Sequence, residues 1–153
     1  MAIIKFLHLL SMSIWVGSIV FFSFFAAPII FKKLPREVAG DVVGGIFPKY
    51  WAIGYAGGAV SLLTLAIMMI SEKDRLYARL VLLVLMLCVS LYSGLAVGKR
   101  AASLKAEMRA SGNAEEKDAL RARFRKVHAI SSILNMTVLA LGSAFIFLTS
   151  MEL

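Results

Sequence analysis

Two histidines, His8 and His128, are the side chains of this sequence best suited to hold a ligand or a metal ion, and the chain contains no other histidine. Each lies near the start of a long apolar segment. A polar side chain is costly in such a segment unless a partner satisfies it or it serves a function. The chemistry of this protein is therefore expected at the ends of its apolar segments.

His128 begins a stripe of polar residues at helical spacing. Ser131, Ser132 and Asn135 follow it at intervals of about one helical turn, so these side chains share one face of a helix. Such a stripe either joins helices through hydrogen bonds or lines a polar pocket, and the sequence leaves both interpretations open. Tyr50, Asp41 or the end of the third apolar segment at residues 98–100 is expected to face the stripe, and Tyr50 is assigned to the site together with the four residues of the stripe. These five residues form the candidate ligand-binding site.

His8 is the centre of a second candidate site. It shares a helical face with Met12, and Met68 and Met69 of the next apolar segment are expected to reach the same end. Histidine and methionine together suit a soft copper ion or a haem b. The alternative is a histidine hydrogen-bonded to a neighbouring helix, with the methionines as packing. The candidate metal or haem residues are thus His8, Met12, Met68 and Met69.

The two histidines are not expected to share one haem or one metal ion. His8 lies at the beginning of the first apolar segment and His128 at the beginning of the fourth. Successive membrane spans run in opposite directions, so these ends face opposite sides of a hydrocarbon core that is about 30 Å thick. Two axial ligands of one iron lie only about 4 Å apart.

The composition indicates an integral membrane protein. Of the 153 residues, 60% are hydrophobic and the mean hydropathy is +0.84. A helical span needs about 20 predominantly apolar residues, and helices satisfy their own backbone groups in lipid. We therefore expect a single all-α domain, an antiparallel four-helix bundle. Its expected spans cover approximately residues 2–31, 50–71, 76–98 and 127–150.

The net charge of +8 follows from topology rather than from a nucleic-acid partner. Most of the 17 basic residues lie in segments 32–49 and 99–126, on one side of a four-span arrangement. The positive-inside rule places these segments in the cytoplasm and both termini outside the inner (plasma) membrane. Anionic lipid headgroups are then their natural neighbours, and nucleic acid is not expected.

The segments between the spans are also expected to be helical. Residues 34–47 suggest a short interfacial helix, with Pro48 starting the second span. Residues 71–75 suggest a tight external hairpin. Spans three and four are expected to extend into the cytoplasm as a charged hairpin, with a turn at 111–113 and Asn113 capping the next helix together with Glu116.

Small residues four apart in the second and third spans predict close helix packing. They include Gly54, Gly58, Gly94 and Gly98. One interpretation assigns these faces to a homodimer and the charged hairpin to docking of a partner. Packing between helices of the same chain is the other.

Two signatures in the chain resemble the family of transmembrane protein 205 and its bacterial relatives of unknown function. The first comprises Leu34-Pro35-Arg36, Gly40, Phe47-Pro48 and Tyr50; the second comprises Leu120-Arg121, Arg123-Phe124, His128, Ser131-Ser132 and Asn135. The resemblance covers essentially the whole chain and implies a four-span membrane protein. Because the animal member is associated with resistance to platinum drugs, it also implies export or sequestration of a small ligand.

A weaker resemblance is to copper-resistance D-type proteins and to small haem-binding protoporphyrinogen oxidases. These share the beginning His8, Trp15 and Gly17, which would give His8 a haem-binding role. The oxidases also rely on a lysine in their third span, whereas Lys99 here lies at the cytoplasmic end, far from His8.

Three functions follow from these observations. We primarily expect a non-enzymatic membrane protein that binds or moves a small molecule or metal species, because the sequence has no nucleotide loop, no Ser–His–Asp set and no carboxylate within a span. The first alternative is a haem- or copper-binding redox protein that uses His8. The second is a structural scaffold that forms homodimers or docks a partner.

Overall fold

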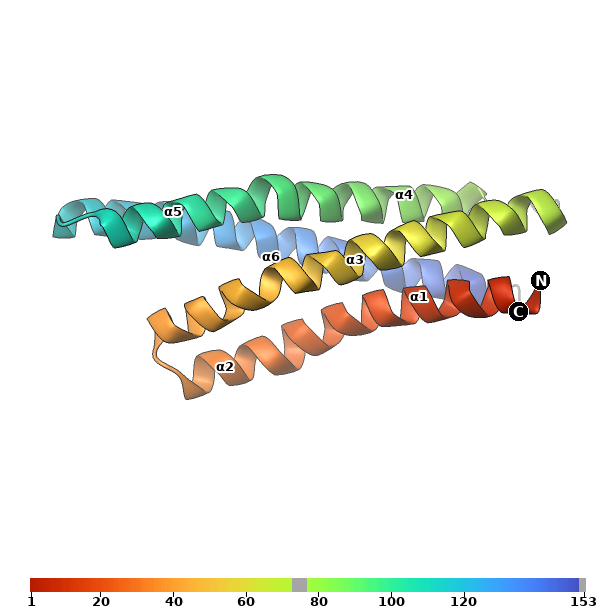
Figure 1. Ribbon diagram of the computed structural model, residues 1–153, viewed down its shortest axis with the longest axis horizontal. Coiled ribbons are helices and arrows are strands. Elements are labelled where there is room, and N and C mark those ends of the chain that lie inside the picture. Colours follow the sequence, from red (N-terminus) through yellow and green to blue (C-terminus); the bar gives the residue numbers. More distant parts are fainter. Residues whose placement is uncertain (73–76, 152–153) are drawn as a thin grey trace.

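The computed structural model describes residues 1–72 and 77–151, and this part of the chain forms helices without any strand (Figure 1). Four rods are long and apolar enough to cross a membrane: Ala2–Lys33, Arg36–Ser71, Tyr77–Ala110 and Ala114–Ser150. Consecutive rods run antiparallel, and the beginning of α1 and the end of α6 lie at the same end of the bundle (Figure 1). The prediction of an all-α, four-span membrane bundle is confirmed.

Two of the rods contain a π-helical segment between α-helical parts. The elements in chain order are α1 (Ala2–Phe21), η1 (Phe22–Ala26), α2 (Ala27–Lys33), α3 (Arg36–Glu72), α4 (Tyr77–Tyr92), η2 (Ser93–Gly98), α5 (Lys99–Ala110) and α6 (Ala114–Ser150). Each π segment inserts one extra residue into a turn and so rotates the faces that follow it. Pro28 lies just after η1, at the second position of α2.

The core lies where α1 packs on α3 and where α4 packs on α6. Its apolar side chains include Met12, Trp15, Ile19, Leu65, Leu83, Met86 and Phe145, all of them almost fully buried. The glycines of α3 make room for these side chains. A Cβ atom at Gly54 would lie 2.9 Å from Nε1 of Trp15, and one at Gly58 would lie 2.9 Å from Cζ3 of the same ring. The small residues thus bring helices of one chain together, and a homodimer would need another surface.

The expectation of a separate interfacial helix is wrong. Residues 36–47 are helical, but they form the first turns of α3, and Pro48 lies inside that helix. A proline ring crowds the carbonyl four residues earlier, here that of Gly44. Because Gly44 and Gly45 have no side chains, the backbone can adjust around the proline ring. Membrane helices tolerate proline where neighbouring groups satisfy the freed carbonyl. The helix begins instead just after Pro35. The carbonyl of Pro35 accepts a hydrogen bond from the N–H of Ala39 at 2.9 Å.

The charged extension of spans three and four is present as predicted. Figure 1 shows α5 and the beginning of α6 reaching past the ends of α2 and α3. Asn113 caps α6, since its side chain accepts a hydrogen bond from the N–H of Glu115 at 2.9 Å. The carboxylate of Glu116 accepts from the hydroxyl of Ser111 at 2.6 Å. The predicted hairpin at residues 71–75 falls largely outside the described residues.

Candidate functional site

The polar stripe of α6 meets side chains from the other rods at Asn135. The Oδ1 atom of Asn135 accepts a short hydrogen bond from the hydroxyl of Tyr50 on α3. Its Nδ2 donates to the hydroxyl of Ser23 on η1 at 2.8 Å. One amide thus joins three rods. The pairing with Tyr50 agrees with the sequence analysis, whereas Ser23 was missed; a lone serine among phenylalanines was its one signal in the sequence.

The other residues of the stripe point into a cavity instead of joining helices. His128 is exposed, and its ring stacks on that of Phe124 with the centroids 6.1 Å apart. The hydroxyl of Ser132 donates to the carbonyl of His128 at 3.0 Å, within the same helix. A cavity of about 400 Å³ is lined by Tyr50, His128, Ser131, Ser132 and Asn135 together. The structure therefore brings all five predicted residues around one space.

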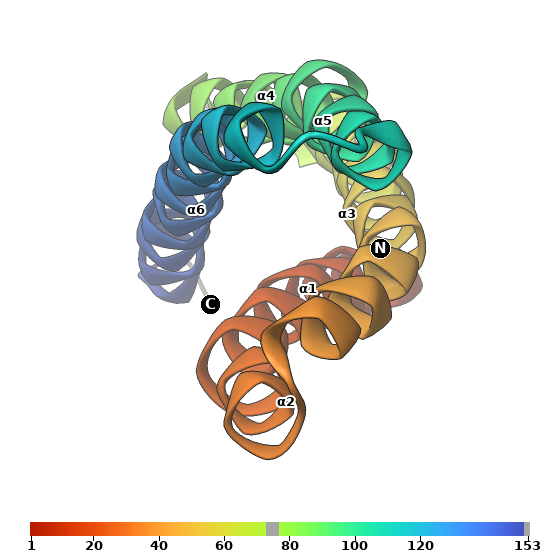
Figure 2. The ribbon, with the colours of Figure 1, turned by 90° about the vertical axis from the view of Figure 1, so that its left-hand side faces the viewer.

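A larger cavity of about 1,030 Å³ adjoins this one. It lies between the beginning of α3 on one side and α5 with the start of α6 on the other. Both cavities share the lining residues Phe31, Val43, Phe47, Trp51, His128 and Ser131. We call the two cavities together the crevice. Figure 2 looks at the molecule from this end and shows α2 and the start of α3 standing apart from α5 and α6.

The mouth of the crevice carries an excess of positive charge. Arg36, Lys105, Arg109 and Arg125 line it, against the single carboxylate of Asp41. Lys105 and Arg109 both approach Oδ1 of Asp41 to 2.5 Å. The hydrogen bond from Lys105, helped by the charge of Arg109, lowers the pKa of the Asp41 carboxyl below its ordinary value. Asp41 is therefore ionised at neutral pH and links α3 to α5.

Both π segments border the crevice. Ser23 of η1 and Ser93 of η2 line the smaller cavity, and Gly98 of η2 lines the larger one. Gly98 also lies under the ring of Trp51, where a Cβ atom would come within 2.7 Å of Cζ2. π segments are rare and occur frequently at functional sites. Their location here was not foreseen, because no sequence pattern distinguishes a π turn from an α turn.

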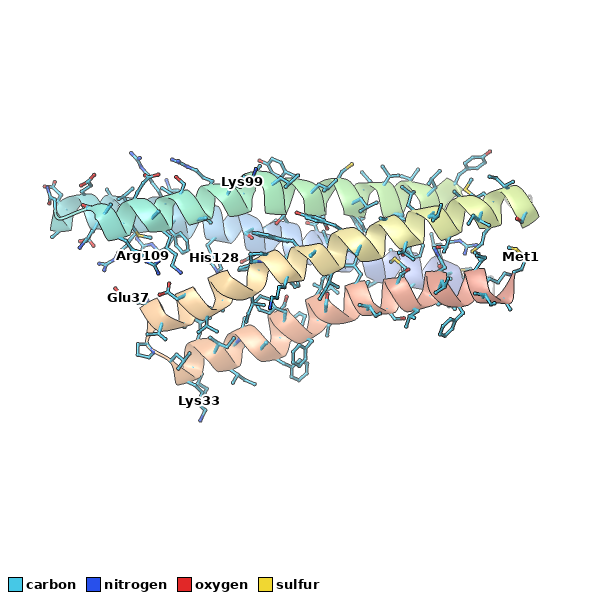
Figure 3. All side chains as sticks on the ribbon, in the orientation of Figure 1. Met1, Lys33, Glu37, Lys99, Arg109 and His128 are labelled. Carbon is cyan, nitrogen blue, oxygen red and sulfur yellow. The ribbon has the colours of Figure 1, made fainter. Side chains whose placement is uncertain are left out.

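The end of the bundle that holds His8 is built differently. In Figure 3, Met1 marks this end, whereas Lys33, Glu37, Arg109 and His128 lie toward the other. His8 is only 1% exposed, and its ring lies 5.5 Å from that of Phe145 on α6. Its Nδ1 is 2.8 Å from the hydroxyl of Thr64 on α3. The sequence analysis did not single out Thr64.

The hydrogen bonds of Thr64 determine which nitrogen of His8 carries the proton. The Thr64 hydroxyl lies 2.8 Å from the carbonyl of Val60 and 3.0 Å from that of Ser61, and it can only donate to carbonyls. With its proton directed to one of these carbonyls, the hydroxyl accepts from Nδ1–H of His8. The buried Nε2 then presents a lone pair, and it has no hydrogen-bond partner among the described residues.

The packing around His8 leaves no room for a haem, and copper binding at that end stays a prediction. The guanidinium of Arg79, a residue only 4% exposed, is close enough to act electrostatically on the imidazole. Met12 and Met68 belong to the apolar core, with Met69 packed against it. A porphyrin could reach the 1% exposed ring only if helices moved apart. The described residues also contain no group of three or more His, Cys, Asp or Glu side chains placed to bind a metal ion.

Comparison with known proteins identifies the family. Residues 10–110 match a family described as a domain of unknown function, DUF4149. The chain belongs to this family. The match includes Ser23, Tyr50 and Trp51, whereas the polar stripe of α6 lies beyond it.

One similar curated protein is an uncharacterised protein of Aquifex aeolicus (strain VF5). It is 46% identical over 56 residues, which are 37% of this chain and 41% of that protein. The chain thus aligns with about two fifths of this relative's length. No solved structure matches the chain. Neither match extends to transmembrane protein 205, to the copper-resistance proteins or to the oxidases, so those resemblances stay predictions.

Proposed function

We propose that this multi-pass membrane protein binds a small ligand in the crevice, without enzymatic chemistry, and retains it or passes it across the membrane. The observation that carries the proposal is that Tyr50, His128, Ser131, Ser132 and Asn135 line one cavity. That cavity opens into a larger one through six shared lining residues. Ligand sites in helical membrane proteins are built in this way, between helices and from a few convergent polar groups.

The alternative role of the stripe, joining helices, applies to one of its four residues. Asn135 bonds to two other rods. By contrast, Ser132 bonds within α6, and His128 and Ser131 have no hydrogen bond to another helix within the described part of the chain. Three polar side chains therefore face the crevice without contributing to helix association. A role toward a ligand accounts for their presence.

The charge distribution supports a cytoplasmic opening in the inner membrane. The crevice lies at the end that carries Lys33, Lys99 and Arg109 (Figure 3), and the positive-inside rule places such an end in the cytoplasm. The termini would then lie outside. The resemblance to the family of transmembrane protein 205 supports export or sequestration as the use of the bound ligand.

Native mass spectrometry of the full chain, purified in mild detergent, tests whether the crevice retains a ligand. We expect His128→Ala and Ser132→Ala to lose the co-purified molecule while the helical content and thermal midpoint stay unchanged. Ser143→Ala is the matched control, because Ser143 is also exposed on α6 and also bonds to the carbonyl four residues earlier (2.9 Å). Unchanged retention together with impaired folding would instead support a purely structural stripe.

A further inference from the structure

The walls of the crevice are suited to hydrocarbon. Phe31, Phe47, Trp51 and Phe124 line it, and α5 contributes the small side chains of Ala101, Ala102 and Ala106. The larger cavity alone, at about 1,030 Å³, is at the upper end of the range for organic ligands, about 300–1,000 Å³. A metal ion or an inorganic anion would leave most of this apolar surface in contact with water. The walls therefore favour an occupant with a long apolar part.

The mouth of the crevice is suited to an anion. Asp41 engages Lys105 and Arg109. Arg36 and Arg125 also line the mouth, and within the described residues they form no ion pair. Two guanidinium groups are thus left to bind a charge that the protein itself does not supply. Guanidinium matches the geometry of phosphate oxygens particularly well.

The charged mouth of the crevice and its floor, where Trp51 lies, are at different depths in the membrane. The exposed residues Lys49 and Lys99 mark the level at which the second and third rods leave their apolar spans. Trp51 lies on the apolar side of this level, whereas Arg36 and Arg109 lie beyond it. Cationic side chains are favoured at the headgroup level of a bilayer. The charged mouth therefore coincides with lipid headgroups and the floor with acyl chains.

The crevice also opens sideways. The smaller cavity extends to Phe24 of η1 and Met136 of α6, which are 56% and 38% exposed on the outer surface. On this side of the cavity, α2 packs on α3 and η1. Figure 2 shows that α2 stands apart from the beginning of α6. An acyl chain can pass through this side without entering water.

From these four features we infer that the ligand is an anionic phospholipid of the surrounding bilayer. Its phosphate lies between Arg36 and Arg125, and an acyl chain leaves between α2 and α6. The inference rests on the proposed function and names the ligand class of the same site. The crevice then selects lipids by the charge of the headgroup.

Lipid titration followed by native mass spectrometry tests this inference. The full chain in detergent is titrated with phosphatidylglycerol, with phosphatidylcholine of the same acyl chains, and with glycerol phosphate, which has no chain. We expect one phosphatidylglycerol to bind about tenfold more tightly than phosphatidylcholine, as charge-assisted hydrogen bonds imply. Glycerol phosphate is expected to bind far more weakly, because it lacks the apolar part.

Charge variants assign the preference to the crevice. Arg36→Gln and Arg125→Gln are each expected to weaken phosphatidylglycerol binding about tenfold, and phosphatidylcholine binding less, because the choline group already neutralises the charge of that phosphate. Arg123→Gln is the matched control, because Arg123 is exposed on α6 but does not line the crevice; its binding should not change. Since neither Arg36 nor Arg125 is ion-paired in the described structure, both variants should fold.

Three outcomes would overturn the inference. They are equal binding of the two lipids, an equal loss in the Arg123→Gln control, and binding of glycerol phosphate as tight as that of phosphatidylglycerol. In each of these cases the proposed function stands if the His128→Ala variant still loses a molecule that the wild type retains. If His128→Ala retains everything that the wild type retains, the proposed function itself fails.

Discussion

The surroundings of His8 and His128 differ although both histidines occupy the same kind of position, near the first turn of an apolar stretch. His8 is 1% exposed and is surrounded by Thr64, Arg79 and Phe145, one residue from each of the other rods. His128 is exposed and packs on Phe124 of its own helix. At the first end the four rods converge; at the other, α2 diverges from α6 (Figure 1).

The comparison shows that a polar residue in a membrane helix has no fixed role. Around His8, serine and threonine hydroxyls pair between helices: Ser11 and Ser61 approach each other to 2.7 Å. These bonds satisfy polar groups and hold α1 against α3. Around His128, the hydroxyls of Ser131 and Ser132 form no hydrogen bond to another helix within the described residues, and they line a cavity. The closed end therefore serves stability, and the open end is available to a ligand.

The largest effect is expected from replacing the two histidines in turn. His8→Ala removes a buried ring and leaves Thr64 without its donor, so it should lower the free energy of unfolding by about 2–4 kcal/mol. His128→Ala removes an exposed ring and should cost less than about 0.5 kcal/mol. Denaturant titration in detergent, followed by circular dichroism, measures both. Equal costs would contradict the distinction between the two ends.

Chemical modification measures the same contrast without a mutation. Because the chain has only two histidines, diethyl pyrocarbonate reports on each end separately. His128 should react at least about tenfold faster than His8, which becomes accessible only when the helices open locally. Peptide mass spectrometry assigns the two rates. Comparable rates in the folded protein would mean that the His8 end also opens readily.

Removing the hydrogen bonds of Asn135 tests the boundary between the two ends. Hydrogen bonds between membrane helices contribute about 0.6 kcal/mol on average and about 1.7 kcal/mol at most. Tyr50→Phe should therefore lower the free energy of unfolding by about 1 kcal/mol. A double-mutant cycle with Asn135→Ala should show coupling of similar size. Tyr92→Phe is the control, since Tyr92 is 58% exposed and has no partner within the described structure.

The smallest effect is expected from acidification of the mouth. Lys105 lowers the pKa of the Asp41 carboxyl, so the contact between α3 and α5 is complete above the pKa of an ordinary aspartate, about 3.9. It should be lost only as the pH falls below that value, through the lowered pKa of the folded state. The contribution is small because the pair is exposed and screened by salt.

Spin labels on exposed positions, introduced by Val38→Cys and Ala110→Cys in a Cys88→Ser background, report the separation of α3 from α5. Their distance distribution should widen below about pH 3.9. Asp41→Asn should show no such change over the same range. Widening already at pH 5 or above would assign the effect to another group.

The fold could largely be predicted from hydropathy. Since a lipid-exposed backbone must be helical, the four spans, the turn at 111–113 and the cap at Asn113 followed from consecutive residues. The start of the second helix was misplaced at Pro48 because proline ends helices in water. In the structure, Gly44 precedes it by one turn and leaves the helix room to continue.

The candidate site could be predicted only in part. Spacing on α6 identified the polar stripe, but Ser23 was missed because the π segment η1 rotates the helix face that carries it. Arg79 carries a charge, which predicts an exposed side chain, whereas in the structure it is only 4% exposed. Neither the rotation of η1 nor the burial of Arg79 can be predicted from the residues that are adjacent in the sequence.

The order of apolar and charged residues was enough to establish where the chain crosses the membrane, because the transfer of a helix into lipid depends on its own side chains. Whether a polar side chain finds a partner depends on how the helices rotate and diverge relative to one another. Packing of Trp15 against Gly54 and Gly58, and the two π segments, determine that rotation. For this reason the enclosed setting of His8 and the accessible one of His128 emerged only from the assembled bundle.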